Sequence, residues 1–96
     1  MVIETPNANK CPARVKRELD DYLRGIPPGS FVLAVLENNL LAAVRYADPK
    51  NLAALPHIVA FLCGRILTRF WGSPTIVQDH LDACRRQRAR KAGGPS

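Results

Sequence analysis

The sequence predicts an all-α protein, a small irregular bundle of four to five helices, and three observations lead to that prediction. Apolar side chains recur with helical spacing in several segments. No segment alternates apolar and polar residues with the period of a strand, and no Asn-Gly or Asp-Gly hairpin signal occurs. A polar residue that caps helices well is followed by proline at Asp48-Pro49 and at Ser73-Pro74, an arrangement typical of helix starts.

The first helix is expected to follow a disordered N-terminal segment, residues 1–11, which is polar and irregular. Pro12 suits a first helical turn, where its missing N–H costs nothing. Gly25 ends the pattern, and the stiff sequence Ile26-Pro27-Pro28-Gly29 follows it. The apolar positions between Pro12 and Gly25 fall on one helical face: Val15, Leu19, Tyr22 and Leu23.

Two short helices come next. Ser30 is expected to cap a helix from Phe31 to about Glu37, which is apolar nearly all round and should be buried on most sides. Asn39 is expected to cap a third helix, from Leu40 to about Ala47. That third helix is too apolar to act as the recognition helix of a helix-turn-helix motif.

The fourth helix is predicted from Pro49 to about Thr68, with Asp48 as its cap. Pro56 lies inside this pattern, so the helix either bends there or divides into two pieces. The last helix is predicted to begin at Ser73-Pro74. Together, these elements predict one helical domain, residues 12–84, followed by a basic flexible tail, residues 85–96.

The net charge of +6 is concentrated in this predicted tail. The chain before it carries nine cations and eight acidic residues, whereas the tail has five cations and no acid: Arg85, Arg86, Arg88, Arg90 and Lys91. Such a cluster can displace counterions from a phosphate backbone, which predicts salt-sensitive, sequence-independent binding of nucleic acid. The alternatives are that the tail only makes the chain more soluble and has no partner, or that it binds an acidic protein surface.

The sequence resembles a family of small uncharacterised proteins encoded by bacteriophages, prophages and related mobile elements. The resemblance rests on segments in matching order: Gly25-Ile26-Pro27-Pro28-Gly29-Ser30-Phe31, Ala34-Val35-Leu36-Glu37-Asn38, Ala47-Asp48, Asn51, Ala54-Leu55 and Trp71-Gly72-Ser73-Pro74. It covers roughly residues 19–81. The resemblance implies a cytoplasmic protein of a mobile element and supplies no established activity.

We call the stiff segment of residues 26–29 the connector. Candidate protein-binding residues are Ile26, Pro27 and Pro28 in the connector, and Trp71. A proline-rich segment loses little entropy on binding, so the connector is either a recognition loop or a rigid corner between two helices. Trp71 is either an exposed interface anchor or a side chain that packs over the start of the last helix.

Neither a catalytic site nor a metal site is predicted, and no cofactor is expected. His80 and Cys84 stand four residues apart on one predicted helix, but no Cys-x-x-Cys or His-x-x-x-His pair supports a metal site. Three cysteines without paired spacing, Cys11, Cys63 and Cys84, indicate a reducing compartment. Neither a signal peptide nor a membrane span is evident, so a cytoplasmic protein that does not enter membranes is expected.

These observations predict a non-catalytic accessory protein of a phage or mobile element, which acts by stoichiometric binding to a host or phage protein. The alternative is a nonspecific nucleic-acid-binding protein that uses the basic tail. Self-association into a homodimer, which would cover apolar surface left over by so small a core, remains open.

Overall fold

The computed structural model describes the backbone of residues 5–92 and the side chains of residues 5–89. Within that part of the chain every regular element is helical, so the predicted all-α fold is confirmed. The five α-helices are α1 (Ala13–Leu23), α2 (Ser30–Leu36), α3 (Leu40–Tyr46), α4 (Pro49–Arg65) and α5 (Pro74–Ala92), and the 3-10 turns are η1 (Ala8–Lys10) and η2 (Thr68–Phe70). None of the described helices is both long and apolar enough to cross a membrane.

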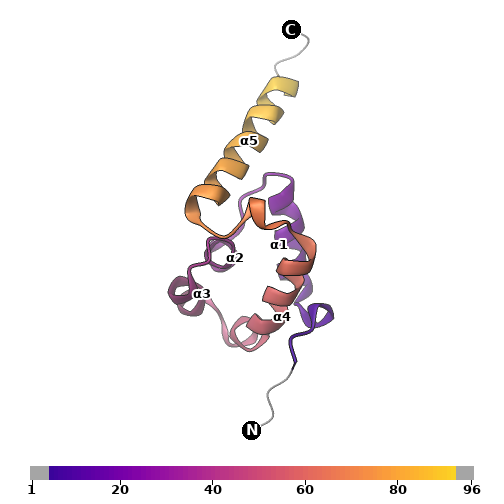
Figure 1. Cartoon of the computed structure of the whole chain (residues 1–96), viewed down its shortest axis with the longest axis vertical. Coiled ribbons are helices and arrows are strands. Elements are labelled where there is room, and N and C mark those ends of the chain that lie inside the picture. Colours follow the sequence, from indigo (N-terminus) through magenta and orange to yellow (C-terminus); the bar gives the residue numbers. More distant parts are fainter. Residues whose placement is uncertain (1–4, 93–96) are drawn as a thin grey trace.

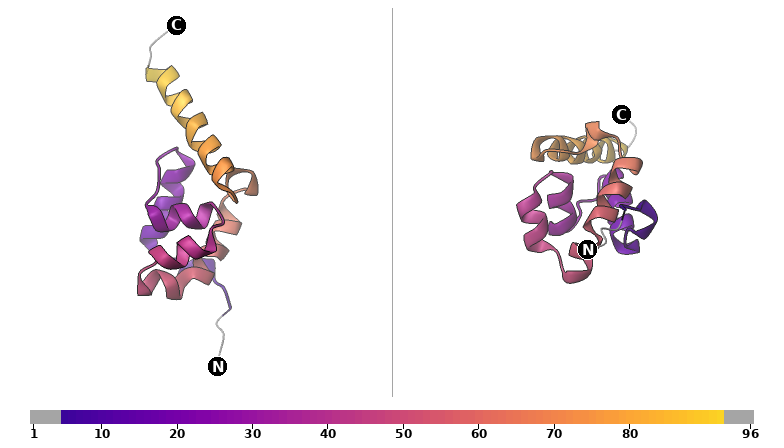
Figure 2. Two further views of the ribbon diagram at one scale, coloured as in Figure 1. Left: turned by 90° about the vertical axis from the view of Figure 1, so that its left-hand side faces the viewer. Right: turned by 60° about the horizontal axis from the view of Figure 1, so that its bottom comes forward.

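Helices α1 to α4 form the body of the molecule, and α5 lies at one end of it and projects beyond (Figures 1 and 2). Helices α2 and α3 pack against each other, while η1 packs against α4. One apolar core joins the elements, and every α-helix contributes to it. Its most deeply buried side chains are Val15, Leu19, Tyr22, Val32, Leu36, Ile58, Leu62 and Val77.

Three predicted helix caps are present. The Asn39 side chain accepts a hydrogen bond from the Ala42 amide at 3.1 Å, and the Asp48 carboxylate accepts one from Asn51 at 2.7 Å. At the start of α5 the Ser73 hydroxyl accepts one from the Ile76 amide at 3.2 Å. Each bond satisfies one of the unpaired N–H groups of a first helical turn, so these boundaries follow from local sequence.

The predicted cap of the second helix is wrong by one residue. Ser30 is the first residue of α2, and Gly29, with an extended backbone, occupies the cap position. The Gly29 amide donates to the Glu18 carboxylate of α1 at 2.9 Å, and this contact between helices fixes where α2 begins.

Helix α4 passes through Pro56 without interruption, so the division of this segment that Pro56 suggested is absent. The proline is exposed and removes one backbone hydrogen bond from the helix. Leu55 before the proline packs against the core, and His57, Ile58 and Leu62 after it are buried, so packing on both sides supports the helix across the proline. Ile66 is extended, so α4 ends at Arg65 rather than at about Thr68.

The prediction that residues 1–11 are disordered is wrong from Asn7 to Cys11, whereas Met1 to Glu4 lie outside the described residues. The Asn7 amide donates to Nδ1 of His57 at 3.0 Å, and η1 follows directly. The Cys11 side chain is 4% exposed and belongs to the core. A buried thiol and a hydrogen bond to a distant histidine therefore attach this segment to the body.

This attachment predicts the order in which the thiols react. Burial raises the pKa of the Cys11 thiol, and nearby Lys16 only partly opposes that rise, so the reactive thiolate is scarce as well as inaccessible. Cys63 is exposed. Alkylation followed by mass spectrometry should modify Cys63 first and Cys11 only after addition of denaturant. Native-state alkylation of Cys11 as fast as that of Cys63 would refute the attachment.

Candidate functional site

The basic segment is helical, and the predicted flexible tail at residues 85–96 is wrong from Arg85 to Ala92. Arginine, glutamine, lysine and alanine all have high helix propensity, and cations are favourable near a helix C-terminus. Helix α5 therefore continues past the end of its apolar pattern. The remaining residues of the predicted tail, Gly93 to Ser96, lie outside the described residues.

Helix α5 docks on the C-terminal end of α1. Gly25 has φ +90°, and a Cβ atom added there would lie 2.4 Å from Cβ of Cys84, so the two segments are in close contact. Two carbonyl groups at this end of α1 accept hydrogen bonds from α5: that of Tyr22 from Nε2 of His80 at 2.8 Å, and that of Arg24 from Arg88 at 2.9 Å. Carbonyls at a helix C-terminus lack partners within the helix. The Tyr22 carbonyl also accepts from the Gly25 amide at 2.9 Å, so α5 adds a second hydrogen bond there, and Arg88 of α5 provides one to the Arg24 carbonyl.

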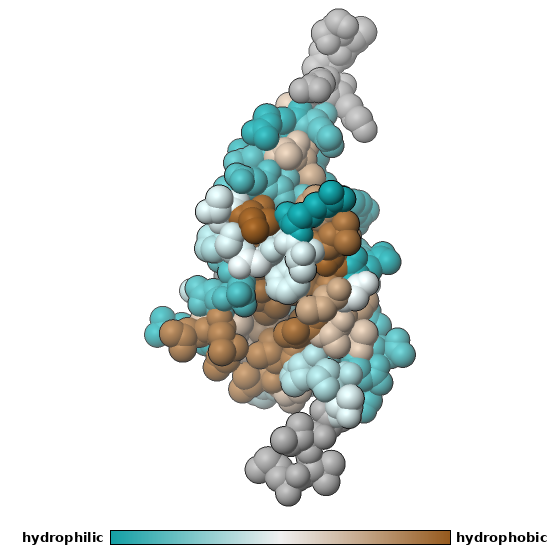
Figure 3. Space-filling view, viewed as in Figure 1, coloured by the Kyte–Doolittle hydropathy of each residue, from teal (hydrophilic) through white to brown (hydrophobic). Residues whose placement is uncertain are grey.

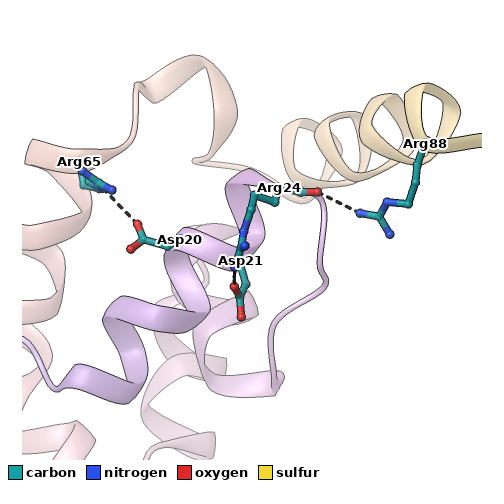
Figure 4. Close-up of polar contacts among 5 residues, drawn as sticks. All are labelled: Asp20, Asp21, Arg24, Arg65 and Arg88. Atoms are coloured by element: carbon teal, nitrogen blue, oxygen red, sulfur yellow. Dashed lines mark hydrogen bonds and ion pairs between the residues drawn. The ribbon is translucent and has the colours of Figure 1, made fainter. Parts of the chain in front are cut away.

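Figure 4 shows the polar contacts around this junction. The Arg88 guanidinium reaches from α5 to the Arg24 carbonyl, while the Arg24 side chain pairs with Asp21 of its own helix. Asp20 accepts a hydrogen bond from Arg65 of α4 at 3.1 Å. The end of α1 is thus tied to α4 on one side and to α5 on another.

Tyr22 is the buried side chain at the centre of this junction. Its hydroxyl donates to the Phe70 carbonyl of η2 at 2.6 Å, and its ring centroid lies 4.6 Å from that of His80. Burial raises the pKa of Tyr22 to about 12, and proximity to Cys84 contributes in the same direction. The phenol therefore remains protonated and holds α1, η2 and α5 together.

A groove of about 380 Å³ opens beside this junction, between the connector, α2 and α5. Among its lining residues Pro27, Leu33, Val77 and Leu81 are apolar, and the charged ones are Glu37, Arg85 and Arg88. The groove therefore brings together residues that are nearly 60 positions apart in the sequence. It joins part of the predicted recognition connector to part of the predicted basic site.

The two groove arginines have partners and retain binding capacity. Arg85 pairs with Asp82 one turn earlier on α5 at 2.9 Å, and Arg88 donates to the Arg24 carbonyl. A guanidinium has five N–H donors, so one such contact leaves others that can bind a carboxylate. The groove thus combines apolar side chains with two sites for an anionic group.

The other predicted site residues lie elsewhere. Ile26 is exposed and Pro28 is half-buried, and neither lines this groove. Trp71 packs against the core, and its indole N–H donates to the Ile66 carbonyl at 3.1 Å. Arg86 is exposed on α5 outside the groove, and the side chains of Arg90 and Lys91 lie outside the described residues.

The histidines serve as hydrogen-bonding groups within the fold. His57 accepts from the Asn7 amide, and His80 bonds to the Tyr22 carbonyl. Cys84 lies 3.7 Å from Nε2 of His80, the same nitrogen that contacts this carbonyl. In the part of the chain that the structure describes, no group of three or more metal-ligating side chains gathers.

The sequence left open an apolar surface that a homodimer would cover, but it did not locate that surface. The side chains of Leu40, Leu41 and Val44 on α3 are exposed, as are those of Leu52 and Val59 on α4. In Figure 3 apolar side chains gather over the lower part of the molecule, where α3 and α4 lie. We call this surface the α3–α4 face: Leu40, Leu41, Val44, Leu52, Leu55 and Val59. The signal was present in α3, because Leu40, Leu41 and Val44 are apolar in addition to the buried Ala43, so the helix has more than one apolar side to cover.

The groove and the α3–α4 face are separate surfaces that share no residue. The chain matches no protein-family model, no curated protein and no solved structure.

Proposed function

We propose that this chain is a non-catalytic accessory protein of a bacteriophage or related mobile element and acts by stoichiometric binding to a host or phage protein. The observation that carries the proposal is the groove, in which Pro27 of the stiff connector lies together with Arg85 and Arg88 of α5. The mobile-element setting follows from the sequence resemblance, and three unpaired cysteines support a reducing cytoplasm.

The chemistry of the groove suits a protein segment with apolar side chains next to a carboxylate. Pro27 is exposed and Leu33 is half-buried, so both offer apolar surface whose burial favours association. Arginine is enriched at the energetic centres of interfaces, where its planar fork binds carboxylates in two-point contacts. The proline connector is already stiff, so binding orders little additional chain.

A matched pair of charge reversals on α5 tests this function. Arg85 lines the groove and Arg86 does not, although the two are adjacent, exposed and equal in charge. We expect R85E to reduce stoichiometric capture of a partner from nuclease-treated host lysate by about tenfold or more, as for loss of an interface arginine. R86E should retain capture close to that of the original chain. Equal capture by the original chain and R85E, or no stoichiometric partner at all, would contradict the proposal.

The second candidate function is nonspecific nucleic-acid binding by α5. It is favoured by the position of the cations on a helix that projects beyond the body (Figure 2). Such binding depends on total charge, so R85E and R86E should weaken it equally, and affinity should fall steeply between low and physiological salt. The anisotropy of a labelled DNA duplex measures both effects, and equal losses with a steep salt slope would favour this candidate over the first.

A further inference from the structure

The α3–α4 face leaves large apolar side chains in water. Leu41 is 85% exposed and Leu40 is 68% exposed on α3, while Leu52 is 45% exposed on α4. Between the two helices lies a cavity of about 80 Å³ whose lining includes Leu40, Leu55 and Val59, so the exposed side chains of both helices border one continuous surface. Soluble monomers rarely expose large contiguous apolar patches, and such patches mark interaction sites.

The charge pattern of this face separates its centre from its border. Its six residues are apolar, and the cavity that they border is also lined by Asn38 and Asn39, which are polar and uncharged. Exposed charged residues of both signs stand at the edge of the face: Arg45 lines one hollow with Leu41 and Val44 of α3, and Asp48 precedes Leu52 of α4 by one helical turn. An apolar centre with a charged border is the composition of a protein interface core and rim.

We infer that the α3–α4 face is the contact surface of a homodimer and that its occupant is a second copy of this chain. Interfaces between proteins that associate transiently are on average no more apolar than the rest of the surface, whereas homodimer interfaces are more apolar and depleted of charge at the centre. The composition of the α3–α4 face is that of a homodimer interface. In a twofold interface the same patch serves both copies, so its border must supply both signs of charge. Asp48 and Arg45 do so.

The placement of α5 favours the same occupant. Helix α5 projects from the end of the molecule opposite α3 and α4, so pairing through this face keeps the two basic helices apart (Figure 1). The groove shares no residue with the face and stays accessible in the dimer. A dimer would therefore present two grooves, and a partner with two matching segments would gain avidity from both.

The mass of the full-length chain in solution tests the dimer, measured by sedimentation equilibrium with a reductant that excludes disulfides through Cys63. We expect a mass twice the 10.6 kDa of one chain. L41E should weaken dimerisation by about thirtyfold or more, as for loss of an interface hot spot. The matched control is L67E, because Leu67 is also an exposed leucine (58%) but lies outside the face and should leave the dimer intact. Both variants should keep the original far-ultraviolet circular dichroism, since both side chains already lie in water.

A monomeric chain at every concentration would overturn the inference, and so would a dimer that L41E leaves intact. A monomer that loses capture of a lysate protein through L41E would assign the face to a different protein. A monomer that binds anionic vesicles through Leu41 would assign it to a lipid surface. The proposed function is tested separately, because R85E should reduce partner capture without changing the mass.

Discussion

Replacement of Tyr22 by alanine is expected to lower the free energy of unfolding by about 3–5 kcal/mol, the usual cost of truncating a buried aromatic side chain. The side chain is fully buried and its hydroxyl bonds to the Phe70 carbonyl, so the variant loses packing and a hydrogen bond together. Domains of ordinary stability have only about 5–15 kcal/mol in total. Urea unfolding followed by circular dichroism should therefore show a variant that has lost a large part of its stability.

The control for this prediction is Tyr22→Phe, which keeps the ring and removes only the hydroxyl. It should cost about 1 kcal/mol, the net value of a typical hydrogen bond. The two chains should also differ in alkali, because folding raises the pKa of Tyr22 from 10.0 to about 12 and so favours the protonated phenol. That stabilisation is complete below pH 10, falls between pH 10 and about 12, and is absent in Tyr22→Phe. Identical alkaline unfolding of the two chains would contradict the role given to the hydroxyl.

Replacement of Gly25 by alanine is expected to displace α5 from the body. The residue has φ +90°, which L side chains rarely adopt, and its new Cβ would lie 2.4 Å from Cβ of Cys84. Strain and overpacking together should cost about 2–4 kcal/mol, measured by urea unfolding. Because the groove forms where α5 meets the connector, Gly25→Ala should also reduce capture of a partner.

Gly72→Ala is the matched control for this effect. Gly72 also has a positive φ, +116°, but a Cβ atom there would meet nothing within 4 Å. Gly72→Ala bears the backbone strain without the clash. The difference between the free energies of unfolding that Gly25→Ala and Gly72→Ala lose therefore measures how closely α5 approaches Gly25. If Gly25→Ala costs no more than Gly72→Ala, then α5 does not press against Gly25.

Features decided within one helical turn were predictable from the sequence. The caps at Asn39, Asp48 and Ser73 depend on a side chain and an amide three residues later, and all three are present. The helical class followed from apolar spacing, which reflects the requirement that each helix bury one face. The cap of α2 escaped prediction because Glu18 of another helix holds Gly29.

Features that depend on distant residues were not predictable. The contact between Asn7 and His57 spans 50 residues and leaves no local pattern. The end of the apolar periodicity predicts a tail at the basic segment, although the residues of that segment favour helix. Only the fold places Pro27 in one groove with Arg85 and Arg88, so the sequence yielded the parts of the candidate site without their arrangement.

Hydrogen exchange of the α5 amides tests the central claim most directly, since the groove exists only if α5 is docked on the end of α1. In the full-length free chain we expect the amides from Val77 to Arg88 to exchange as slowly as those of α4, because this stretch includes the buried Val77 and Leu81 and the contacts of His80 and Arg88. Exchange at random-coil rates throughout residues 74–92 would show that α5 is not docked on α1. The connector and the arginines of α5 would then form no common groove, which would contradict the account.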